Sequence, residues 1–134
     1  MSLHYETDRI PSPEAVAALY DAAGLRRPTQ DLERIGRMMT HANLIITAWD
    51  TETDTLLGIA RSLTDFSYVC YLADLAVHPD YQKNGIGREL IRRTQEVCGD
   101  EVMVLLLAAP AAAEYYPHIG FTKVENGWFV ARVR

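Results

Sequence analysis

The sequence has few of the features that mark secreted, membrane or metal-binding proteins. Only two of its 134 residues are cysteines, Cys70 and Cys98, and they show no CxxC or Cys/His spacing. No apolar run approaches the roughly 20 residues that cross a bilayer, and the N-terminus has no charged-then-apolar signal pattern. We therefore expect a cytoplasmic protein with reduced cysteines, no membrane partner and no metal.

Positive charge is also in short supply. Thirteen Lys and Arg stand against 18 Asp and Glu, a formal net charge of −5, so a polyanionic partner such as nucleic acid is disfavoured. The arginines come as scattered pairs (26–27, 92–93, 132 and 134) rather than a stripe, which is typical of solvated surface. The overall balance favours a cationic, amine-bearing ligand.

What the sequence does contain is enough apolar material for one core. With 49% apolar and 23% charged residues, the length predicts a single domain, 1–134. The patterns predict an α+β chain. Its expected helices are 13–24, a second that starts at Thr29 or Asp31 and ends at Thr40, 85–98, and 111–116, the last stopped by Pro117. Its expected strands are 3–8, 43–49, 55–63, 68–77, 102–107 and a final hairpin, 121–124 with 128–133. We expect strand 102–107 to be covered on both faces and parallel to strand 68–77. Side chains expected to point inward include Leu32, Ile35, Met39, Leu90, Ile91, Thr94, Val97 and Cys98.

A glycine-containing loop lies between strand 68–77 and helix 85–98. Gly85 and Gly87 precede the helix, where unpaired N–H groups can hold a phosphate. The loop does not fit a Walker sequence, and it lacks the third glycine of a dinucleotide fingerprint. Seven residues, 78–84, also separate the strand from Gly85, which argues further against nucleotide oxidoreduction.

The extended pattern around these glycines is more specific. It reads Leu75-Ala-Val77, Pro79, Tyr81 and Gln82-Lys-Asn-Gly85-Ile-Gly87, and it resembles motif A of the GNAT superfamily of acetyl-CoA-dependent N-acetyltransferases. Farther along, Ala113-Glu-Tyr115-Tyr116 with Gly120-Phe121 is similar to a second signature of that family. The two motifs cover about residues 71–124 in the family's order.

This resemblance implies a GNAT fold, with a mixed sheet, a βαβ unit, parallel strands that splay apart and helices on both faces. It also implies acetyl-CoA as the cosubstrate. The loop and helix start would hold the pyrophosphate, and pantetheine would lie along the free backbone of the strand. The implied cofactor-binding residues are Leu75, Ala76, Val77, Gln82, Lys83, Asn84, Gly85, Ile86, Gly87 and Arg88.

The resemblance further implies the parts that acetyl transfer needs. A backbone N–H near Val77 is the candidate oxyanion donor, and Tyr116 corresponds to the family's general-acid tyrosine, with Tyr115 as the second candidate. Asp74 is an ionisable residue in an otherwise apolar strand. Strand alternation places it on one face with Leu72 and Ala76. It is a candidate catalytic residue that contacts the amine or a relay water, and a structural hydrogen-bonding role is the alternative.

The acceptor site in this fold is built by the first helix pair, the loop at 64–67 and the end of the final hairpin. Tyr20, Asp65 and Phe66 are the candidate substrate-binding residues. We expect the acceptor to be a small-molecule primary amine. The alternatives are a protein or peptide amino group, or coenzyme A binding without turnover. Dimers are common in the family, which leaves a homodimer open, but no stretch of this sequence indicates one.

Overall fold

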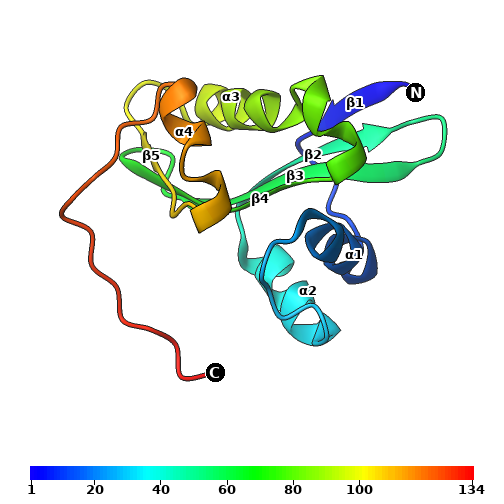
Figure 1. Cartoon of the computed structure of the whole chain (residues 1–134), viewed down its shortest axis with the longest axis horizontal. Coiled ribbons are helices and arrows are strands. Elements are labelled where there is room, and N and C mark those ends of the chain that lie inside the picture. Colours follow the sequence, from blue (N-terminus) through cyan, green and yellow to red (C-terminus); the bar gives the residue numbers. More distant parts are fainter.

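A five-stranded sheet runs through the molecule between two layers of helices (Figure 1). The computed structural model describes residues 1–134 apart from the side chain of residue 111. The elements in chain order are β1 (Leu3–Glu6), α1 (Pro13–Ala23), α2 (Leu32–His41), β2 (Leu44–Asp50), β3 (Thr55–Thr64), β4 (Val69–Val77), the 3-10 helix η1 (Pro79–Asn84), α3 (Ile86–Cys98), β5 (Met103–Leu105), the 3-10 helix η2 (Pro110–Ala112) and α4 (Tyr115–His118). The strands lie in the order β1-β2-β3-β4-β5. All neighbouring strands are antiparallel except β4 and β5, which are parallel. The predicted α+β class and GNAT-type sheet are confirmed.

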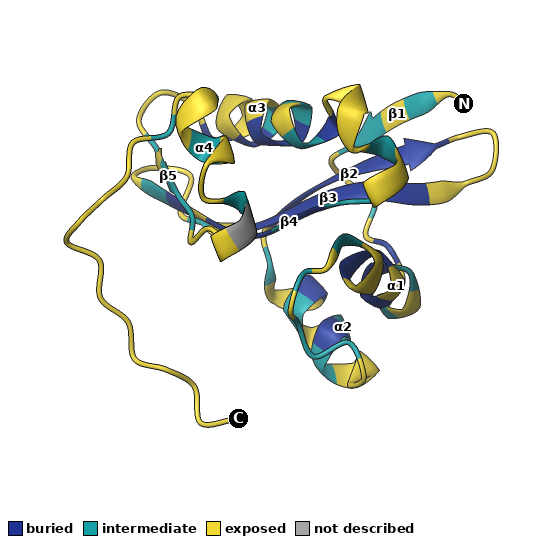
Figure 2. Cartoon of the chain, in the orientation of Figure 1, coloured by how far each residue is buried: buried dark blue, intermediate teal, exposed yellow. Residues whose placement is uncertain are grey.

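The helix layers divide the core in two. α3 packs on one face of the sheet, and α1 and α2 pack on the other, so β2 and most of β3 are buried on both sides (Figure 2). The α3 face includes Ile46, Leu57, Ile86 and Leu90. The α1–α2 face includes Val16, Tyr20, Ile35, Met39 and Ile59. No helix among the described residues is long and apolar enough to cross a membrane.

Local sequence signals account for the first two helices. The Ser12 side chain accepts a hydrogen bond from the backbone N–H of Ala15 at the start of α1, and Gly24 ends that helix with a φ of 74°. Asp31 caps α2 in the same way through the N–H of Arg34. Ile35 and Met39 are buried as predicted, but the prediction for Leu32 is wrong, because this residue lies in the exposed first turn of α2.

A glycine in β3 allows α3 to lie close to the sheet. A Cβ atom added to Gly58 would be 2.9 Å from Cγ2 of Ile86 and 3.1 Å from Cδ1 of Leu90, both of which are fully buried side chains. Because packed interiors leave little room for adjustment, this close approach requires glycine. On the outer side of α3 the prediction for Val97 is wrong, since that side chain is 45% exposed.

β4 contains a bulge that changes which side chains face which layer. Arg61 of β3 pairs with Asp74 and Ser62 pairs with Leu72, so Ala73 has no partner in β3. Leu72 therefore packs on the α3 face, whereas Asp74 and Ala76 face α1 and α2. The expectation that Leu72 shares a face with Asp74 is wrong, because one extra residue inverts the alternation.

β4 and β5 are hydrogen-bonded over a short stretch only. The paired residues are Val69 with Met103, Cys70 with Val104, and Tyr71 with Leu105. Beyond Tyr71, β4 continues to Val77 with no strand beside it on that side in the part of the chain that the structure describes. The predicted parallel pairing and splaying are confirmed, and they leave backbone of β4 free at the sheet edge.

The C-terminal part differs from the sequence prediction. Instead of forming a hairpin, residues 121–134 run as an extended segment away from the sheet and end near α2 (Figure 1). Consequently Trp128, Phe129 and Val130 are more than 80% exposed. With no hairpin beside it, β5 is short and Met103 is 54% exposed, so the prediction of a strand covered on both faces is also wrong.

The short helix before this segment also departs from prediction. A 3-10 turn, η2, precedes α4, and Pro117 lies inside α4 rather than ending it. Proline is tolerated there because a residue in the first turn of a helix needs no intrahelical partner for its nitrogen.

Candidate active site

The glycine loop forms an open helix start next to the free part of β4. η1 ends at Gly85, which has a φ of 73°, and α3 begins at Ile86 with no side chain capping its first N–H groups. A Cβ atom added to Gly85 would meet nothing within 4 Å, so its conformation rather than space favours glycine. A pocket of about 370 Å³ extends from Gly85 and Arg88 along one side of α3 as far as Gln95, and its lining also includes Glu89 and Arg92. The geometry provides free N–H groups and a guanidinium for an anionic group.

The remaining predicted cofactor residues surround this helix start. Leu75, Ala76 and Val77 lie in the unpaired part of β4, and Gln82, Lys83 and Asn84 form the end of η1. The Gln82 side chain lies against β4, with its Nε2 3.5 Å from the Val77 carbonyl oxygen. The structure thus brings the predicted cofactor-binding residues to one side of the molecule.

Two adjacent tyrosines of α4 lie near the glycine loop, one with its hydroxyl close to Gly87 and the other packed against the α3-side core. The hydroxyl of Tyr115 and the Val77 side chain each lie 3.6 Å from the position that a Cβ atom on Gly87 would occupy. Tyr116 packs edge-to-face against Phe121, with ring centroids 5.5 Å apart, and borders the α3-side core. Burial, and secondarily the neighbouring Tyr115, raises the pKa of Tyr116. Its phenol therefore stays protonated at neutral pH, as a proton donor must.

Asp74 lies at the centre of a buried ion-pair network. Its side chain is inaccessible to solvent; Oδ1 accepts from Arg27 Nε at 2.6 Å, and Oδ2 accepts from Arg61 Nε at 2.5 Å and the Tyr20 hydroxyl at 2.7 Å. Burial alone would raise the pKa of Asp74, but the Arg61 hydrogen bond and charge, together with Tyr20 and Arg27, hold that pKa below its usual value. Both oxygens are occupied and the carboxylate stays ionised, which favours the structural alternative for this residue.

The other predicted acceptor residues occupy two different places. Tyr20 is fully buried beneath β4, and burial and the Asp74 carboxylate raise its pKa, so its hydroxyl is committed to the network. Asp65 accepts hydrogen bonds from the N–H groups of residues 67, 68 and 69, which lower its pKa and organise the β3–β4 turn. Phe66, next to it, is 47% exposed with a φ of 57°. The structure does not bring the turn to Tyr20 and Asp74.

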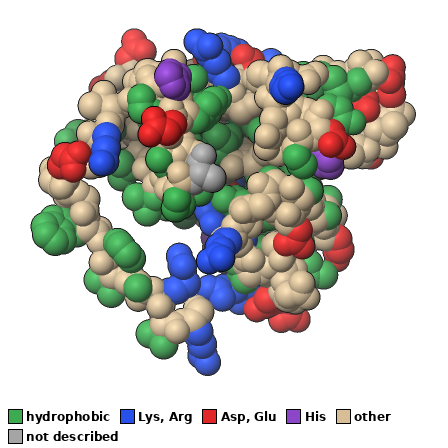
Figure 3. Space-filling view, in the orientation of Figure 1, with side chains coloured by type: hydrophobic (Ala, Val, Ile, Leu, Met, Phe, Trp, Pro, Cys, Tyr) green, Lys and Arg blue, Asp and Glu red, His purple; other side chains and the backbone are tan. Residues whose placement is uncertain are grey.

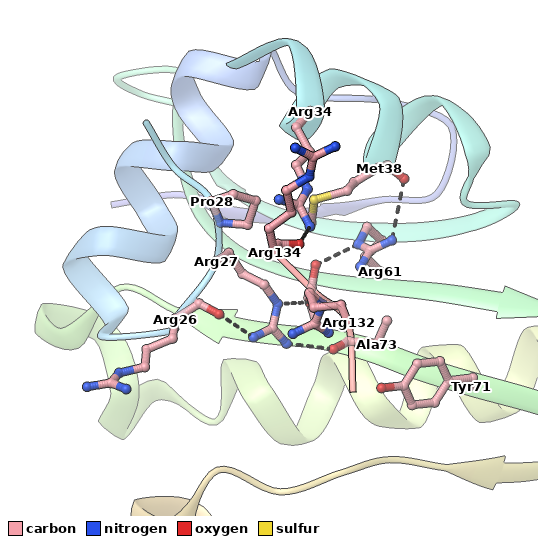
Figure 4. Close-up of a pocket in the computed structure, with 11 residues that line it drawn as sticks. Arg26, Arg27, Pro28, Arg34, Met38, Arg61, Tyr71, Ala73, Arg132 and Arg134 are labelled. Carbon is pink, nitrogen blue, oxygen red and sulfur yellow. Dashed lines mark hydrogen bonds and ion pairs between the residues drawn. The ribbon is translucent and has the colours of Figure 1, made fainter. Parts of the chain in front are cut away.

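The hollow beside Asp74 is instead lined by arginines. A pocket of about 530 Å³ opens between the α1–α2 loop, α2, β3, β4 and the C-terminal segment (Figure 4). In the space-filling view, Lys and Arg side chains gather in the hollow between the C-terminal segment and the α1–α2 layer (Figure 3). The six pocket arginines are Arg26, Arg27, Arg34, Arg61, Arg132 and Arg134.

Sequence reasoning missed this pocket because it assigned Arg26, Arg27, Arg132 and Arg134 to solvated surface and did not consider Arg34 or Arg61. One signal was available for Arg61, a cation in the apolar strand Leu56–Leu63 that precedes the strand carrying Asp74. Two opposite charges in neighbouring buried strands indicate a pair. The structure also contains no group of three or more His, Cys, Asp or Glu side chains placed to hold a metal ion within its described residues.

Comparison with known proteins agrees with this geometry. A family model described as the acetyltransferase (GNAT) domain matches residues 36–123. Two proteins named uncharacterized N-acetyltransferase ycf52 are similar: that of Gracilaria tenuistipitata var. liui is 32% identical over 74 residues, and that of Porphyra purpurea is 27% identical over 116 residues. The matches cover 54% and 81% of this chain, but only 41% and 64% of those proteins. The chain thus spans less than two thirds of either relative.

A solved structure extends the likeness to nearly the whole chain. It is a probable acetyltransferase from meticillin-resistant Staphylococcus aureus, with a TM-score of 0.82 and 25% identity over 98% of this chain and 100% of that one. The fold is thus shared with that structure over nearly its whole length. Because the family model matches well over half of the sequence, the chain belongs to the GNAT acetyltransferase family.

Proposed function

We propose that the protein transfers the acetyl group of acetyl-CoA to the primary amine of a small molecule. The observation that carries this proposal is the position of β4, which offers unpaired backbone beside the glycine loop at its edge and the arginine pocket on its α1–α2 face. A volume of about 530 Å³ suits a small molecule. In this proposal acetyl-CoA lies along the free edge of β4, and the acceptor lies in the pocket on the α1–α2 face of the same strand.

Acetyl-CoA would be held by groups that the fold leaves free. The N–H groups at the start of α3 would bind the pyrophosphate, with Lys83 and Arg88 adding charge. Pantetheine would hydrogen-bond to the backbone of residues 75–77, in the manner of an added strand. The family supports acetyl-CoA as the cosubstrate, because its GNAT domain covers both the free β4 edge and the glycine loop.

The reaction is a direct attack. The acceptor enters as a neutral amine after losing one proton to solvent; its nitrogen bonds to the thioester carbonyl carbon, and a backbone N–H near Val77 stabilises the oxyanion. The C–S bond then breaks, Tyr116 protonates the departing thiolate, and the proton lost by the nitrogen restores the phenol. The products are the N-acetylated amine and free coenzyme A.

Asp74 has a positioning role in this scheme. Its carboxylate holds Arg27 and Arg61 against the floor of the acceptor pocket, and Nη2 of Arg27 also donates to the Ala73 carbonyl at 2.9 Å. Since the bulge at Ala73 leaves that residue without a partner in β3, Arg27 fixes the backbone next to the transfer point.

The test is release of free thiol from acetyl-CoA across a panel of primary amines, with calorimetry of acetyl-CoA binding alone. We expect one binding site per chain and thiol release that depends on an amine. If the protein binds acetyl-CoA but releases no thiol with any amine, including lysine-containing peptides, the enzymatic proposal is contradicted. Coenzyme A binding without turnover would then be the remaining function.

A further inference from the structure

The arginine pocket is positively charged, although the molecule as a whole has a net negative charge. The chain carries a formal charge of −5 with 13 Lys and Arg, yet six of those cations line this one pocket. They come from separate parts of the chain: Arg26 and Arg27 from the α1–α2 loop, Arg34 from α2, Arg61 from β3, and two from the C-terminal segment (Figure 4). The fold, rather than a basic stretch of sequence, collects them.

The single acidic side chain in the pocket does not neutralise this charge. Asp74 pairs with Arg27 and Arg61, and across the described residues the remaining four arginines have no carboxylate side chain within 4.0 Å. Of these four side chains only Arg34 makes a hydrogen bond to another described residue, from its Nη2 to the main-chain oxygen of the last residue, Arg134, at 3.4 Å. Like charges held together repel unless an anion joins them.

Guanidinium groups bind carboxylates and phosphates through paired, charge-assisted hydrogen bonds. A purely cationic amine would be repelled by these arginines, whereas an amine that also carries an anion would be attracted. The same positive surroundings favour the neutral form of a bound amine, which is the form that attacks a thioester. No carboxylate base is then required in the pocket, which agrees with the full occupation of Asp74.

Resting on the proposed acetyl transfer, we infer that the arginine pocket holds an anionic group of the acceptor, and that the acceptor class is a primary amine bearing a carboxylate or a phosphate. Arg34 and Arg26, which are outside the Asp74 network, bind that anion, Arg26 by turning inward from the exposed position in which its guanidinium points away from Arg34 (Figure 4). Arg27 and Arg61, fixed by Asp74, orient the molecule toward the β4 edge. The acceptor thus carries an anionic group, unlike the purely cationic amine that the net charge of the sequence favours.

The experiment compares matched amines that differ in one charge. Phosphoethanolamine is compared with ethanolamine, β-alanine with β-alaninamide, and spermidine serves as the cationic amine. Thiol release gives kcat and KM for each with the wild type, Arg26→Gln, Arg34→Gln and the control Arg37→Gln. Arg37 lies on the same helix as Arg34 but is exposed and does not line the pocket.

In at least one pair, we expect kcat/KM to be roughly tenfold or more higher for the anionic amine than for its uncharged counterpart. The pair that shows this preference identifies the anion that the pocket binds, a phosphate or a carboxylate. Each pocket variant should raise the KM for that amine by roughly 10- to 100-fold, as expected for a lost charge-assisted hydrogen bond, with a smaller change in kcat. Arg37→Gln should behave as wild type.

Two results would overturn the inference while the proposed function stands: turnover that favours ethanolamine, β-alaninamide or spermidine, or an anion preference that survives in both pocket variants. If no amine releases thiol, the proposed function fails. Calorimetry with phosphoethanolamine and β-alanine on the coenzyme-A-loaded protein then tests whether the pocket binds an anion, independently of turnover. Binding that is lost in Arg34→Gln but kept in Arg37→Gln supports the site, and absence of binding to the wild type refutes it.

Discussion

Replacing Asp74 by asparagine separates a catalytic role from a positioning role. The substitution keeps the shape of the side chain but removes the charge that Arg27 and Arg61 share at 2.6 and 2.5 Å. The Asp74 side chain is inaccessible, and those of Arg61 and Arg27 are 11% and 29% exposed. The variant thus leaves one guanidinium almost fully buried without a counter-charge.

The expected loss of stability is large. Breaking one side of a buried ion pair costs about 3–5 kcal/mol, because the remaining charge stays desolvated. For a chain of 134 residues, an unfolding entropy of about 2.1 cal/mol/K per residue gives roughly 0.28 kcal/mol/K. The midpoint of thermal unfolding should therefore fall by about 10–18 °C. Cofactor affinity, which depends on the β4 edge and the glycine loop, should change much less.

The pH dependence gives an independent check. Because the folded-state pKa of Asp74 lies below its unfolded value, its contribution to stability is complete above pH ~4 and is lost as the pH falls through the folded-state pKa. Urea unfolding at pH 7 and at steps from pH 5 to pH 2.5 should show the wild type losing this contribution in acid. Asp74→Asn should lack that part of the loss, so the two proteins converge at low pH.

One combination of results would refute this reasoning. If Asp74→Asn unfolds within 1 kcal/mol of the wild type and keeps the same acid profile, but loses turnover, then Asp74 acts on the substrate and not through the arginines. Arg61→Gln is the matched variant. It should reproduce both the destabilisation and the altered acid profile if the carboxylate works through its partners.

Three further predictions concern the glycines and the tyrosines. Gly85→Val should weaken acetyl-CoA binding, measured by calorimetry, at least about tenfold, because a β-branched residue disfavours the positive φ at this position. Gly85→Asn should retain binding, because Asn is compatible with a positive φ. Equal affinities in the two variants would show that the loop does not bind the phosphate. Gly58→Ala should lower the free energy of unfolding by about 1–3 kcal/mol, because its Cβ atom would be 2.9 Å from Ile86; a neutral effect would show that α3 can shift. Tyr116→Phe should reduce kcat roughly 100-fold without changing acetyl-CoA affinity, and a larger loss in Tyr115→Phe would transfer the acid role to the residue beside the glycine loop.

The local parts of the fold follow from the sequence. The first helix, the helix after the glycine loop and the three central strands lie within one residue of their predicted ranges, because caps, glycines and β-branched residues act on neighbours only a few residues away. The C-terminal hairpin does not form, although Asn126-Gly127 is a favourable hairpin turn. A turn sequence favours a particular connection between two strands, but it does not determine whether those strands pair with the rest of the sheet.

The acceptor side was beyond sequence reasoning for a related reason. Arg26, Arg34 and Arg132 are far apart along the chain, and each taken alone is an ordinary surface residue. Only the packing of α1 and α2 against β3 and β4 brings them to one pocket. Net charge was a poor guide as well, since it averages over the molecule, whereas a ligand responds to the few charges within a Debye length, about 8 Å at physiological salt.

The bulge at Ala73 has a consequence for how the protein can change over time. After it, the side chains of β4 alternate between two environments. Asp74 and Ala76 point toward the α1–α2 layer, where only Asp74 lines the arginine pocket, and Leu75 and Val77 point toward the α3 core. The thioester would contact only the backbone at the strand edge, which is the same for every amino acid. Substitutions at positions 75, 76 and 77 can therefore change the packing of the two core layers without changing the backbone at the transfer point, whereas position 74 is held by its two ion pairs. Deletion of Ala73 would leave Leu72 opposite Ser62 and Asp74 opposite Arg61 in a regular ladder, so both sets of side chains would keep their faces. What would be lost is the bulge carbonyl to which Arg27 donates, and with it the contact that fixes the backbone at this point of the strand.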